Sequence, residues 1–511
     1  MLDIKTLESW LWEGACTLRG KLDAPKYKDY ILPLIFIKRL SDVFDDEIEK
    51  LSREYDNVEL TLELVKKDPT LVRFYIDPKY SWQNIRTHKI EGMGAFLTDV
   101  VRGIAKDNEN LKGVIDVVDF NASTSGERTV PDETLSRLIE TLSKHRLGLK
   151  DAEPDILGRA YEYLLRKFAE GQGQSAGEFY TPKEVGWIMA YILDPEQGET
   201  VYDPAVGSAG LLIKCALVLK EKYPKKIDKP LQLYGQEQNP VTYAMAKMNM
   251  IIHDMQGEIA IGDTLRNPKF KTGTILEKFD MVTANPMWNQ DGYDSDFYEN
   301  DKYDRFKYGY PTAQSADWGW AQHMVSSLKE EGKAAVVLDT GAVSRGSGNK
   351  NKNAEKDVRK GMVDDDLVEA VLLLPDNLFY NTTAPGIIIF FNKNKSKERK
   401  GKVLLINATE EYKKSKESSK NYISDESIIR IVKAFKDFKD VEKFAKVIDL
   451  EEIKKNDYNL SPSRYVYTGE VEELREIPEI LWEIEELKEE EREIDGRLGE
   501  IIEKIFPYGE I

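Results

Sequence analysis

The sequence is poor in the residues that build thiol and metal chemistry. Among its 511 residues there are two cysteines, Cys16 and Cys215, and four histidines. The cysteines lie far apart and show no metal-ligand spacing, so we expect neither a disulfide framework nor a zinc site. No metal ion is assigned to the chain.

Long apolar runs and a secretory leader are also absent from the sequence. No apolar stretch approaches the roughly 20 residues that a membrane-spanning helix needs. The first residues carry Asp3, Glu8 and Glu13, unlike the basic start and apolar middle of a signal peptide. We therefore expect a cytoplasmic chain that makes no contact with a membrane.

An excess of positive charge is the third absence. The chain has 73 basic and 91 acidic residues, a net charge of −18, and so acidic a chain is not expected to grip a phosphate backbone strongly by itself. If it acts on DNA, a partner is expected to help. Basic residues do gather in Lys393–Lys402 and Lys413–Lys420. The first of these runs is either a solvated hairpin between two apolar strands or a phosphate contact.

What the sequence contains changes in character along the chain, which is long for one domain. Residues 1–150 have helical patterns with few Gly and Pro, and predict a helical N-terminal domain. Residues 151–405 alternate apolar strands with helical segments, which predicts an α/β fold with a doubly wound, parallel or mixed sheet. The expected strands are 200–202, 231–235, 281–284, 334–338, 367–374 and 386–391.

Residues 406–511 are charged and again helical, and we expect a C-terminal helical region that docks on a subunit. Near the end, apolar residues follow a 4-3 spacing that is interrupted only where Glu491 occupies a seam position. Such a helix needs a partner helix, either in the N-terminal domain of this chain or in another subunit. The apolar positions are Ile480, Ile484, Leu487, Ile494, Leu498, Ile501 and Ile505.

A turn rich in small residues follows the first expected strand, where α/β folds bind ligands. Its spacing is not that of the G-x-G-x-x-G fingerprint, so a nucleoside with an amino-acid tail fits it better than a dinucleotide. The next strand leads to Glu237, a candidate acceptor for ribose hydroxyls, and a third leads to Asp263, a candidate acceptor for an adenine amino group. The ligand-binding candidates in the turn are Asp203, Ala205, Gly207, Ser208, Ala209 and Gly210.

The tetrapeptide Asn285-Pro286-Met287-Trp288 follows a further apolar strand. The amino group of adenine is a weak nucleophile, and two hydrogen-bond acceptors can draw it toward a tetrahedral geometry. The Asn285 side-chain oxygen and the Pro286 carbonyl supply such acceptors, and the Trp288 ring offers a face on which an extruded base stacks. The tetrapeptide therefore indicates methyl transfer to an amino nitrogen.

With these motifs the chain resembles the modification (M) subunits of type I restriction-modification systems, which are adenine-N6 DNA methyltransferases. The resemblance covers nearly the whole chain. It is carried by Leu18-Arg-Gly20, Tyr30-Ile-Leu-Pro33, Gly177-Glu-Phe-Tyr-Thr-Pro182, Asp203-Pro-Ala-Val-Gly-Ser-Ala-Gly210, Gly235-Gln-Glu237, Gly262-Asp263, Asn285-Pro-Met-Trp288, Leu374-Pro-Asp-Asn-Leu-Phe379 and Asn456-Asp-Tyr-Asn-Leu-Ser461.

The resemblance implies a Rossmann-like sheet that binds S-adenosylmethionine, with a helical N-terminal domain and a C-terminal helical or coiled-coil extension. It implies duplex DNA as substrate and, as partners, a specificity (S) subunit that reads the sequence, a second M subunit and a restriction (R) subunit. It also adds to the cofactor-binding residues Glu178, Phe179, Tyr180, Thr181, Pro182 and Lys183.

Met287 departs from the commonest form of the family's tetrapeptide, which has a second proline there. Because that proline mainly shapes the backbone, we expect activity with a looser loop. The following aromatic-rich segment, residues 289–309, is either a mobile flap beside the active site or a segment whose aromatic rings pack it onto the domain. Two other functions stay open: methyl transfer to a protein or an RNA, and a catalytically silent scaffold that binds the cofactor.

Overall fold

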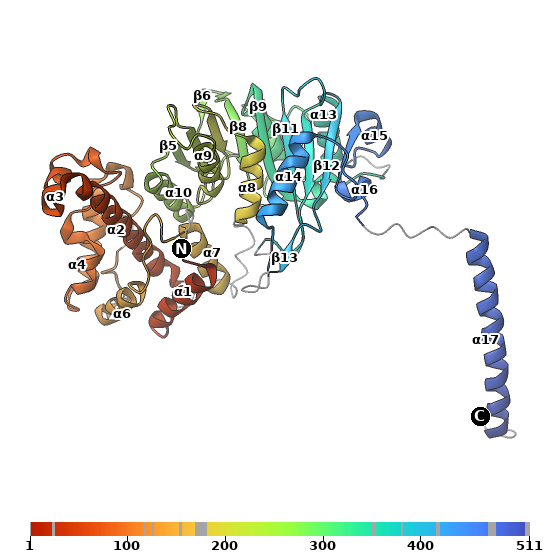
Figure 1. The fold of residues 1–511 in the computed structure, drawn as a ribbon, viewed down its shortest axis with the longest axis horizontal. Coiled ribbons are helices and arrows are strands. Elements are labelled where there is room, and N and C mark those ends of the chain that lie inside the picture. Colours follow the sequence, from red (N-terminus) through yellow and green to blue (C-terminus); the bar gives the residue numbers. More distant parts are fainter. Residues whose placement is uncertain are drawn as a thin grey trace. The chain divides into compact units, whose positions relative to one another are not determined.

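The computed structural model describes residues 2–22, 26–116, 119–124, 127–152, 156–168, 181–349, 353–379, 382–414, 420–468 and 477–505. Two compact units are present (Figure 1): residues 1–467, and residues 468–511, which contain the helix α17 (Ile477–Ile505). Among the described residues, no helix combines the length and the apolar character needed to cross a bilayer.

The N-terminal part of the first unit is helical, as expected. Its longest helix, α2, buries a nearly continuous run from Ile31 to Phe44, because other helices surround it. Helix starts use the side-chain caps that the sequence offers; Asp3 accepts from the Thr6 N–H, and Asn57 accepts from the Leu60 N–H. The helices are α1 (Ile4–Leu18), α2 (Lys28–Tyr55), α3 (Val58–Lys67), α4 (Trp82–Thr87), α5 (Met93–Asp107), α6 (Asp132–Leu142) and α7 (Ile156–Phe168), with a short pair β1 (Ser123–Thr124) and β2 (Glu127–Arg128).

A nine-stranded sheet follows, in the order β15-β12-β10-β11-β9-β8-β3-β4-β5. It is mixed: β11 runs antiparallel to both of its neighbours and β15 antiparallel to β12, while the other pairs are parallel. All six strands expected from the sequence belong to it. The strands are β3 (Thr200–Asp203), β4 (Gln232–Glu237), β5 (Gln256–Ile261), β8 (Phe279–Ala284), β9 (Leu328–Asp339), β10 (Val368–Leu373), β11 (Gly386–Asn392), β12 (Lys402–Asn407) and β15 (Ala445–Asp449).

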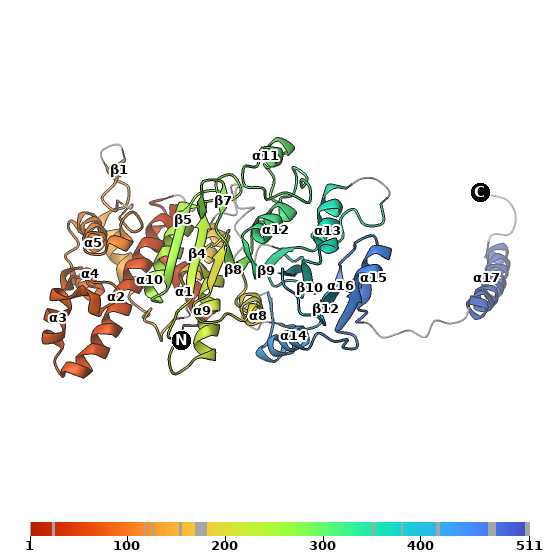
Figure 2. The same ribbon diagram turned by 90° about the horizontal axis from the view of Figure 1, so that it is seen from above.

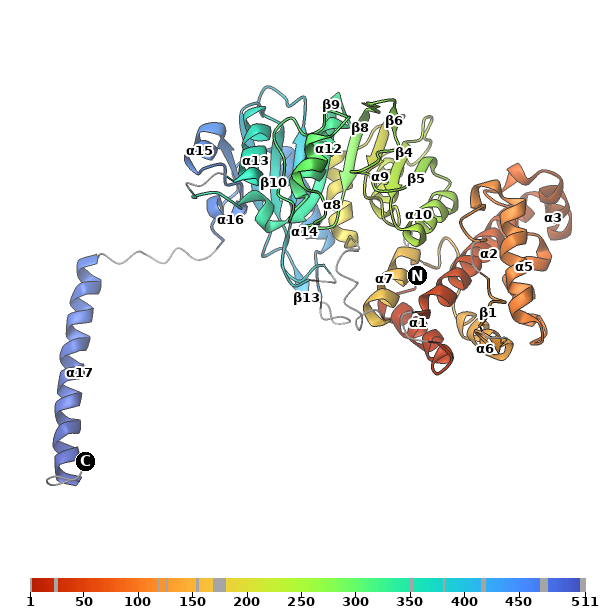
Figure 3. The ribbon, with the colours of Figure 1, turned by 180° about the vertical axis from the view of Figure 1, so that it is seen from behind.

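Helices cover both faces of this sheet, so its central strands are apolar on both sides. Along β11, Ile388 and Phe390 enter one core while Ile387 and Ile389 enter the other. Figures 2 and 3 show the two helical layers. One layer contains α8 (Lys183–Leu193), α9 (Gly210–Lys222), α10 (Pro240–Ile252) and α14 (Asp425–Asp437), and the other contains α12 (Asp317–Ser326) and α13 (Ala354–Asp364).

Short elements complete the first unit: the strand pairs β6 (Lys271–Thr272) with β7 (Ile275–Leu276) and β13 (Lys413–Lys414) with β14 (Asn421–Tyr422), and the helices α11 (Ser295–Glu299), α15 (Leu450–Lys455) and α16 (Pro462–Tyr465). The α/β fold with a helical N-terminal part and a C-terminal helix is confirmed. The division at about residues 150 and 405 stays a prediction, although the sheet itself continues beyond 405 through β12 and β15.

The basic run Lys393–Lys402 connects β11 to β12, which lie on opposite sides of β10, so it is a crossover and not a hairpin. Two of its cations point inward. Lys395 is buried and pairs with Asp366 at 2.6 Å, and Arg399 pairs with the buried Glu369 at 3.0 Å. These two side chains hold the crossover to the sheet.

The second unit contains the single long helix that the apolar spacing predicts. Its apolar side chains are exposed within this unit, which leaves a stripe suited to a partner helix. The partner itself stays a prediction. The exposed members of the stripe are Ile480, Ile484, Leu487, Ile494, Leu498 and Ile501.

Candidate active site

Four of the sequence motifs meet at one edge of the sheet. Strands β3, β4, β5 and β8 are parallel, and their register pairs Asp203 with Gly235 and Glu237 with Ile261. Their carboxyl ends therefore lie side by side, where open α/β sheets bind ligands. The turn after β3, Glu237, Asp263 and Asn285 are all placed there by the strands that precede them.

The turn after β3 has the backbone that its small residues predict. Gly207 and Ala209 adopt left-handed conformations, with φ of 54° and 68°, and Ala209 is the N-cap residue of α9. A side-chain carbon added at Gly207 would meet no atom within 4 Å, so the backbone is open on that side. The Asp203 carboxylate accepts from the Ala205 N–H at 3.0 Å and fixes the start of the turn.

Glu237 joins this turn to the next strand. One carboxylate oxygen accepts from the Gly207 N–H at 3.0 Å and the other from the Asn239 N–H at 2.8 Å. These two bonds fix the orientation of the carboxylate at the end of β4. Burial raises the pKa of Asp203 well above its usual value, and the nearby Glu237 raises it further against the lowering effect of the Ala205 N–H.

Asp263 is engaged by a neighbouring pair of side chains. Its carboxylate accepts from the Arg266 guanidinium at 2.9 Å and from the Tyr293 hydroxyl at 3.1 Å, and the Arg266 guanidinium lies 4.6 Å from the centre of the Tyr293 ring. Burial and the Asp263 charge raise the pKa of Tyr293. Asp263 thus ties the segment after the tetrapeptide to the sheet edge, and its role toward an adenine amino group stays a prediction.

Asn285 directly follows β8, and both the nitrogen and the oxygen of its side-chain amide form hydrogen bonds. Its Nδ2 donates to the Thr181 hydroxyl at 3.1 Å, and its Oδ1 accepts from the Trp288 indole N–H at 3.2 Å. The first bond joins residues 104 positions apart. It brings the end of the expected cofactor segment, where Pro182 caps α8 and Lys183 is exposed, beside the tetrapeptide. Glu178, Phe179 and Tyr180 lie outside the described residues.

Trp288 is nearly buried, and Pro286 and Met287 before it are buried and half-buried. Its ring meets the Phe379 ring edge-on at 4.7 Å, and a side-chain carbon on Gly386 would come within 3.0 Å of it. Phe379 is a contact that we did not assign to the site from sequence. It belongs to the segment 374–379 that carries the family resemblance, in the connection from β10 to β11.

Lys420, at the end of the second basic run, anchors this connection. Its amine donates to Asn377 Oδ1 at 3.1 Å and to the carbonyls of Phe379 and Thr382 at 2.6 and 3.0 Å. The cation thus holds the segment that carries Phe379 against Trp288.

The segment 289–309 packs onto the domain, which supports the second of its two expected roles. Tyr293, Tyr298 and Phe306 are buried in one cluster with Leu265 and Trp320. A further anchor is Arg305, which is buried and donates to the Leu265 carbonyl, outside this segment, at 2.7 Å.

A buried ion-pair network, which sequence reasoning missed, supports the start of this segment. Asp317 accepts from the Asn289 N–H at 2.9 Å, and its other oxygen pairs with Arg345 at 2.7 Å. Arg345 also pairs with Asp339 and Glu355. Burial raises the pKa of Asp317, although the Asn289 and Arg345 donors offset part of this rise. These partners are distant in sequence and form no local motif.

The sequence matches two family models, described as N-6 DNA Methylase over residues 152–474 and HsdM N-terminal domain over residues 7–142. The MjaVIII type I restriction enzyme methylase subunit of Methanocaldococcus jannaschii is 39% identical over 510 residues, which cover 96% of this chain and 84% of the relative. The chain belongs to the family of type I restriction enzyme methylase subunits.

Other relatives of this methylase subunit agree. The HindI methylase subunit of Haemophilus influenzae is 34% identical over 400 residues, covering 75% of this chain and 85% of that one. A crystal structure of the type I restriction-modification system methyltransferase subunit from Streptococcus thermophilus has a TM-score of 0.72 at 28% identity, covering 91% of this chain and all of the other. The activity of the methylase subunit is accordingly that of a DNA methyltransferase with a modification role.

Proposed function

We propose that the chain transfers a methyl group from S-adenosylmethionine to the N6 amino group of adenine in duplex DNA. The observation that carries this proposal is the hydrogen bond from Asn285 to Thr181, at 3.1 Å. It connects the tetrapeptide suited to hold an amino group with the segment expected to bind the cofactor. The two regions proposed to hold the reacting groups are therefore neighbours, which supports direct transfer between them.

The cofactor side of the site fits a nucleoside with an amino-acid tail. Gly207 leaves the turn open to close approach by a ligand, and Glu237, which two backbone donors orient, is the proposed acceptor for the two ribose hydroxyls. When bound, S-adenosylmethionine supplies the methyl group on a sulfonium sulfur. Ser208, Ala209 and Gly210, with Thr181 to Lys183, complete the proposed binding surface.

On the target side, Asn285 and Pro286 accept hydrogen bonds from the adenine amino group and direct its lone pair toward the methyl group. The Trp288 indole already donates to Asn285 Oδ1, but that oxygen has a second lone pair for the base. The base leaves the duplex to reach these groups and stacks on Trp288. Because Trp288 is only 9% exposed in this structure, stacking requires its ring to become more accessible when the base enters. The proton released from the amino group passes to solvent after transfer.

We also propose that sequence recognition comes from a separate specificity subunit, and that a second copy of this chain and a restriction subunit complete the complex. The net charge of −18 supports dependence on a partner, because this chain alone attracts a phosphate backbone weakly. The exposed apolar stripe of α17 supports docking through a helix.

Transfer of labelled methyl from S-adenosylmethionine to duplex DNA tests the proposal, with and without the specificity subunit. Asn285→Ala is expected to lower the rate by about 10² to 10³, the cost of removing one preorganised polar contact from a transition state. Asn300→Ala, which changes an exposed asparagine at the end of α11, is the matched control and is expected to keep the rate.

The product identifies the reaction. N6-methyladenine in the DNA is expected after nucleoside digestion. Label in protein or RNA instead would favour the alternative substrates. A complete complex with bound cofactor and no transfer would favour the silent scaffold.

A further inference from the structure

Helix α10 belongs to two hydrophobic cores at once. Met245, Met248 and Ile252, spaced three and four residues apart, lie in the core of the N-terminal helices. Ala246 and Met250 lie in the core beneath the sheet. The helix therefore packs with one face against the N-terminal part and with another against the methyltransferase sheet.

A polar contact also joins the N-terminal part to α10. The Arg73 guanidinium donates to the carbonyl of Ile252, in the last turn of α10, where the helix dipole favours a cation. The same guanidinium pairs with Glu47 of α2 at 3.1 Å. Arg73 thus fastens the end of α10 to the longest N-terminal helix.

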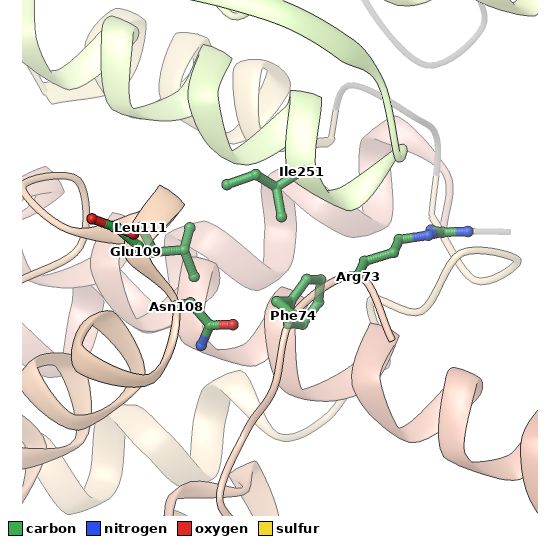
Figure 4. Close-up of a pocket in the computed structure, with 6 residues that line it drawn as sticks. All are labelled: Arg73, Phe74, Asn108, Glu109, Leu111 and Ile251. Atoms are coloured by element: carbon green, nitrogen blue, oxygen red, sulfur yellow. The ribbon is translucent and has the colours of Figure 1, made fainter. Parts of the chain in front are cut away.

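Packing beside this contact is incomplete. A cavity of about 250 Å³ lies there (Figure 4), with Ile251 of α10 on one side and side chains of the N-terminal part on the other. A space of this volume holds several water molecules, so the end of α10 is not fully packed against the N-terminal part at this point. Arg73 lines this space and also makes the polar contact to the end of α10. The lining residues are Arg73, Phe74, Asn108, Glu109, Leu111 and Ile251.

The same helix holds the turn after β3 at two points. The Asn249 side chain, which is buried, donates from Nδ2 to the Ser208 carbonyl at 2.8 Å. At the other end of α10, the N–H of its N-cap residue Asn239 donates to Glu237, whose second oxygen accepts from Gly207. A shift of α10 consequently moves both the turn and the carboxylate proposed to bind the ribose.

We propose that α10 couples the N-terminal helices to the cofactor turn, so that Arg73 and Asn249 are positioning residues for cofactor binding. This inference rests on the proposed function, because it takes the turn as the S-adenosylmethionine site. Coupling is reciprocal. Movement of the N-terminal helices changes cofactor affinity, and cofactor binding steadies the joint at Arg73.

Calorimetric titration of the full chain with S-adenosylmethionine tests the coupling. Asn249→Ala is expected to weaken binding about fivefold, the equivalent of one neutral hydrogen bond. Arg73→Met, which has no contact with the turn, is expected to weaken it about two- to fivefold. The double variant is expected to lose less than the product of the two effects, because both act through α10.

Arg86→Met is the matched control. It removes an exposed pair with Glu140 at 3.1 Å, within the same N-terminal helices but away from α10, and is expected to leave affinity unchanged. If the parent chain binds S-adenosylmethionine and Arg73→Met binds it with the same affinity, the coupling is overturned and the proposed function is not. No binding by the parent chain would overturn the proposed function instead.

Hydrogen exchange of the parent chain keeps the inference testable if Arg73→Met does not fold. Cofactor is expected to slow exchange at residues 71–76 and 249–253 in the parent chain, and to slow the first segment less in Asn249→Ala. A role confined to stability would slow exchange alike throughout the N-terminal helices when cofactor binds, and not selectively at residues 71–76. Equal exchange at residues 71–76 with and without bound cofactor would overturn the coupling.

Discussion

Replacing Arg345 by methionine is expected to destabilise the chain and to displace the loop that carries the tetrapeptide. Arg345 lies between three carboxylates, of Asp317, Asp339 and Glu355, and the Asp317 and Glu355 side chains are 0% and 4% exposed. Asp317 in turn holds the N–H of Asn289, the residue after Trp288. Methionine keeps much of the side-chain volume but removes the positive charge, so the buried carboxylates lose their cation.

The expected cost in stability is about 3 kcal/mol, near the lower end of the range for breaking a buried ion pair, because Arg345 itself is 30% exposed. The cost depends on pH. Without Arg345, the pKa of Asp317, already raised by burial, rises further. The folded chain then binds protons more tightly than the unfolded chain, so its stability falls as pH increases from the ordinary carboxyl pKa upward. The loss is therefore larger at pH 8 than at pH 5.5.

Urea unfolding at the two pH values measures the loss of stability. Methyl transfer to DNA in the presence of the specificity subunit measures the effect on the reaction rate. We expect the transfer rate to fall about 10- to 100-fold, because a loop displaced by about 1 Å misaligns the reacting groups. Arg399→Met is the matched control. It leaves Glu369 unpaired at the start of β10, at the sheet edge opposite the site, and is expected to cost stability but little of the rate.

Two results would refute this reasoning. One is an Arg345→Met chain whose unfolding free energy matches that of the parent at pH 8, since the buried carboxylates would then not depend on the cation. The other is a rate loss no greater than in Arg399→Met, which would mean that Asp317 does not support the tetrapeptide through Asn289.

Asp203→Asn keeps the acceptor for the Ala205 N–H but removes a carboxyl group whose pKa is raised by burial. The melting temperature of the variant is therefore expected to fall less between pH 5 and pH 8 than that of the parent chain. An equal fall in both chains would contradict the raised pKa of Asp203. Lys420→Met removes three donors from the segment that carries Phe379. We expect about 1 to 3 kcal/mol lower stability and a change in Trp288 fluorescence, and identical spectra would argue against this anchor. Residues 468–511 form a separate unit, so their deletion is expected to shift the melting temperature of the remaining chain by less than about 2 °C in calorimetry. A truncated chain that does not fold would show that the first unit depends on these residues.

The sequence determined the features that depend on local pattern. Apolar strands separated by helical segments predicted the sheet, and all six expected strands are present, because a strand covered on both faces has a distinctive composition. The ends of two of those strands, and of a further strand that leads to Asp263, also located Glu237, Asn285 and Asp263, since carboxyl ends of parallel strands meet at one edge. Likewise, the spacing of apolar residues predicted the long helix at the end of the chain.

Only the tertiary structure decided what depends on neighbours distant in sequence. Lys393–Lys402 connects β11 to β12, and because β10 lies between these two strands the run is a crossover. Two of its cations, Lys395 and Arg399, point inward. Folding also brought Asp317 to Asn289, Phe379 to Trp288 and Asn249 to Ser208. A sequence pattern records which face of an element is apolar, but not which other element covers it. The support behind the site therefore became visible only in three dimensions.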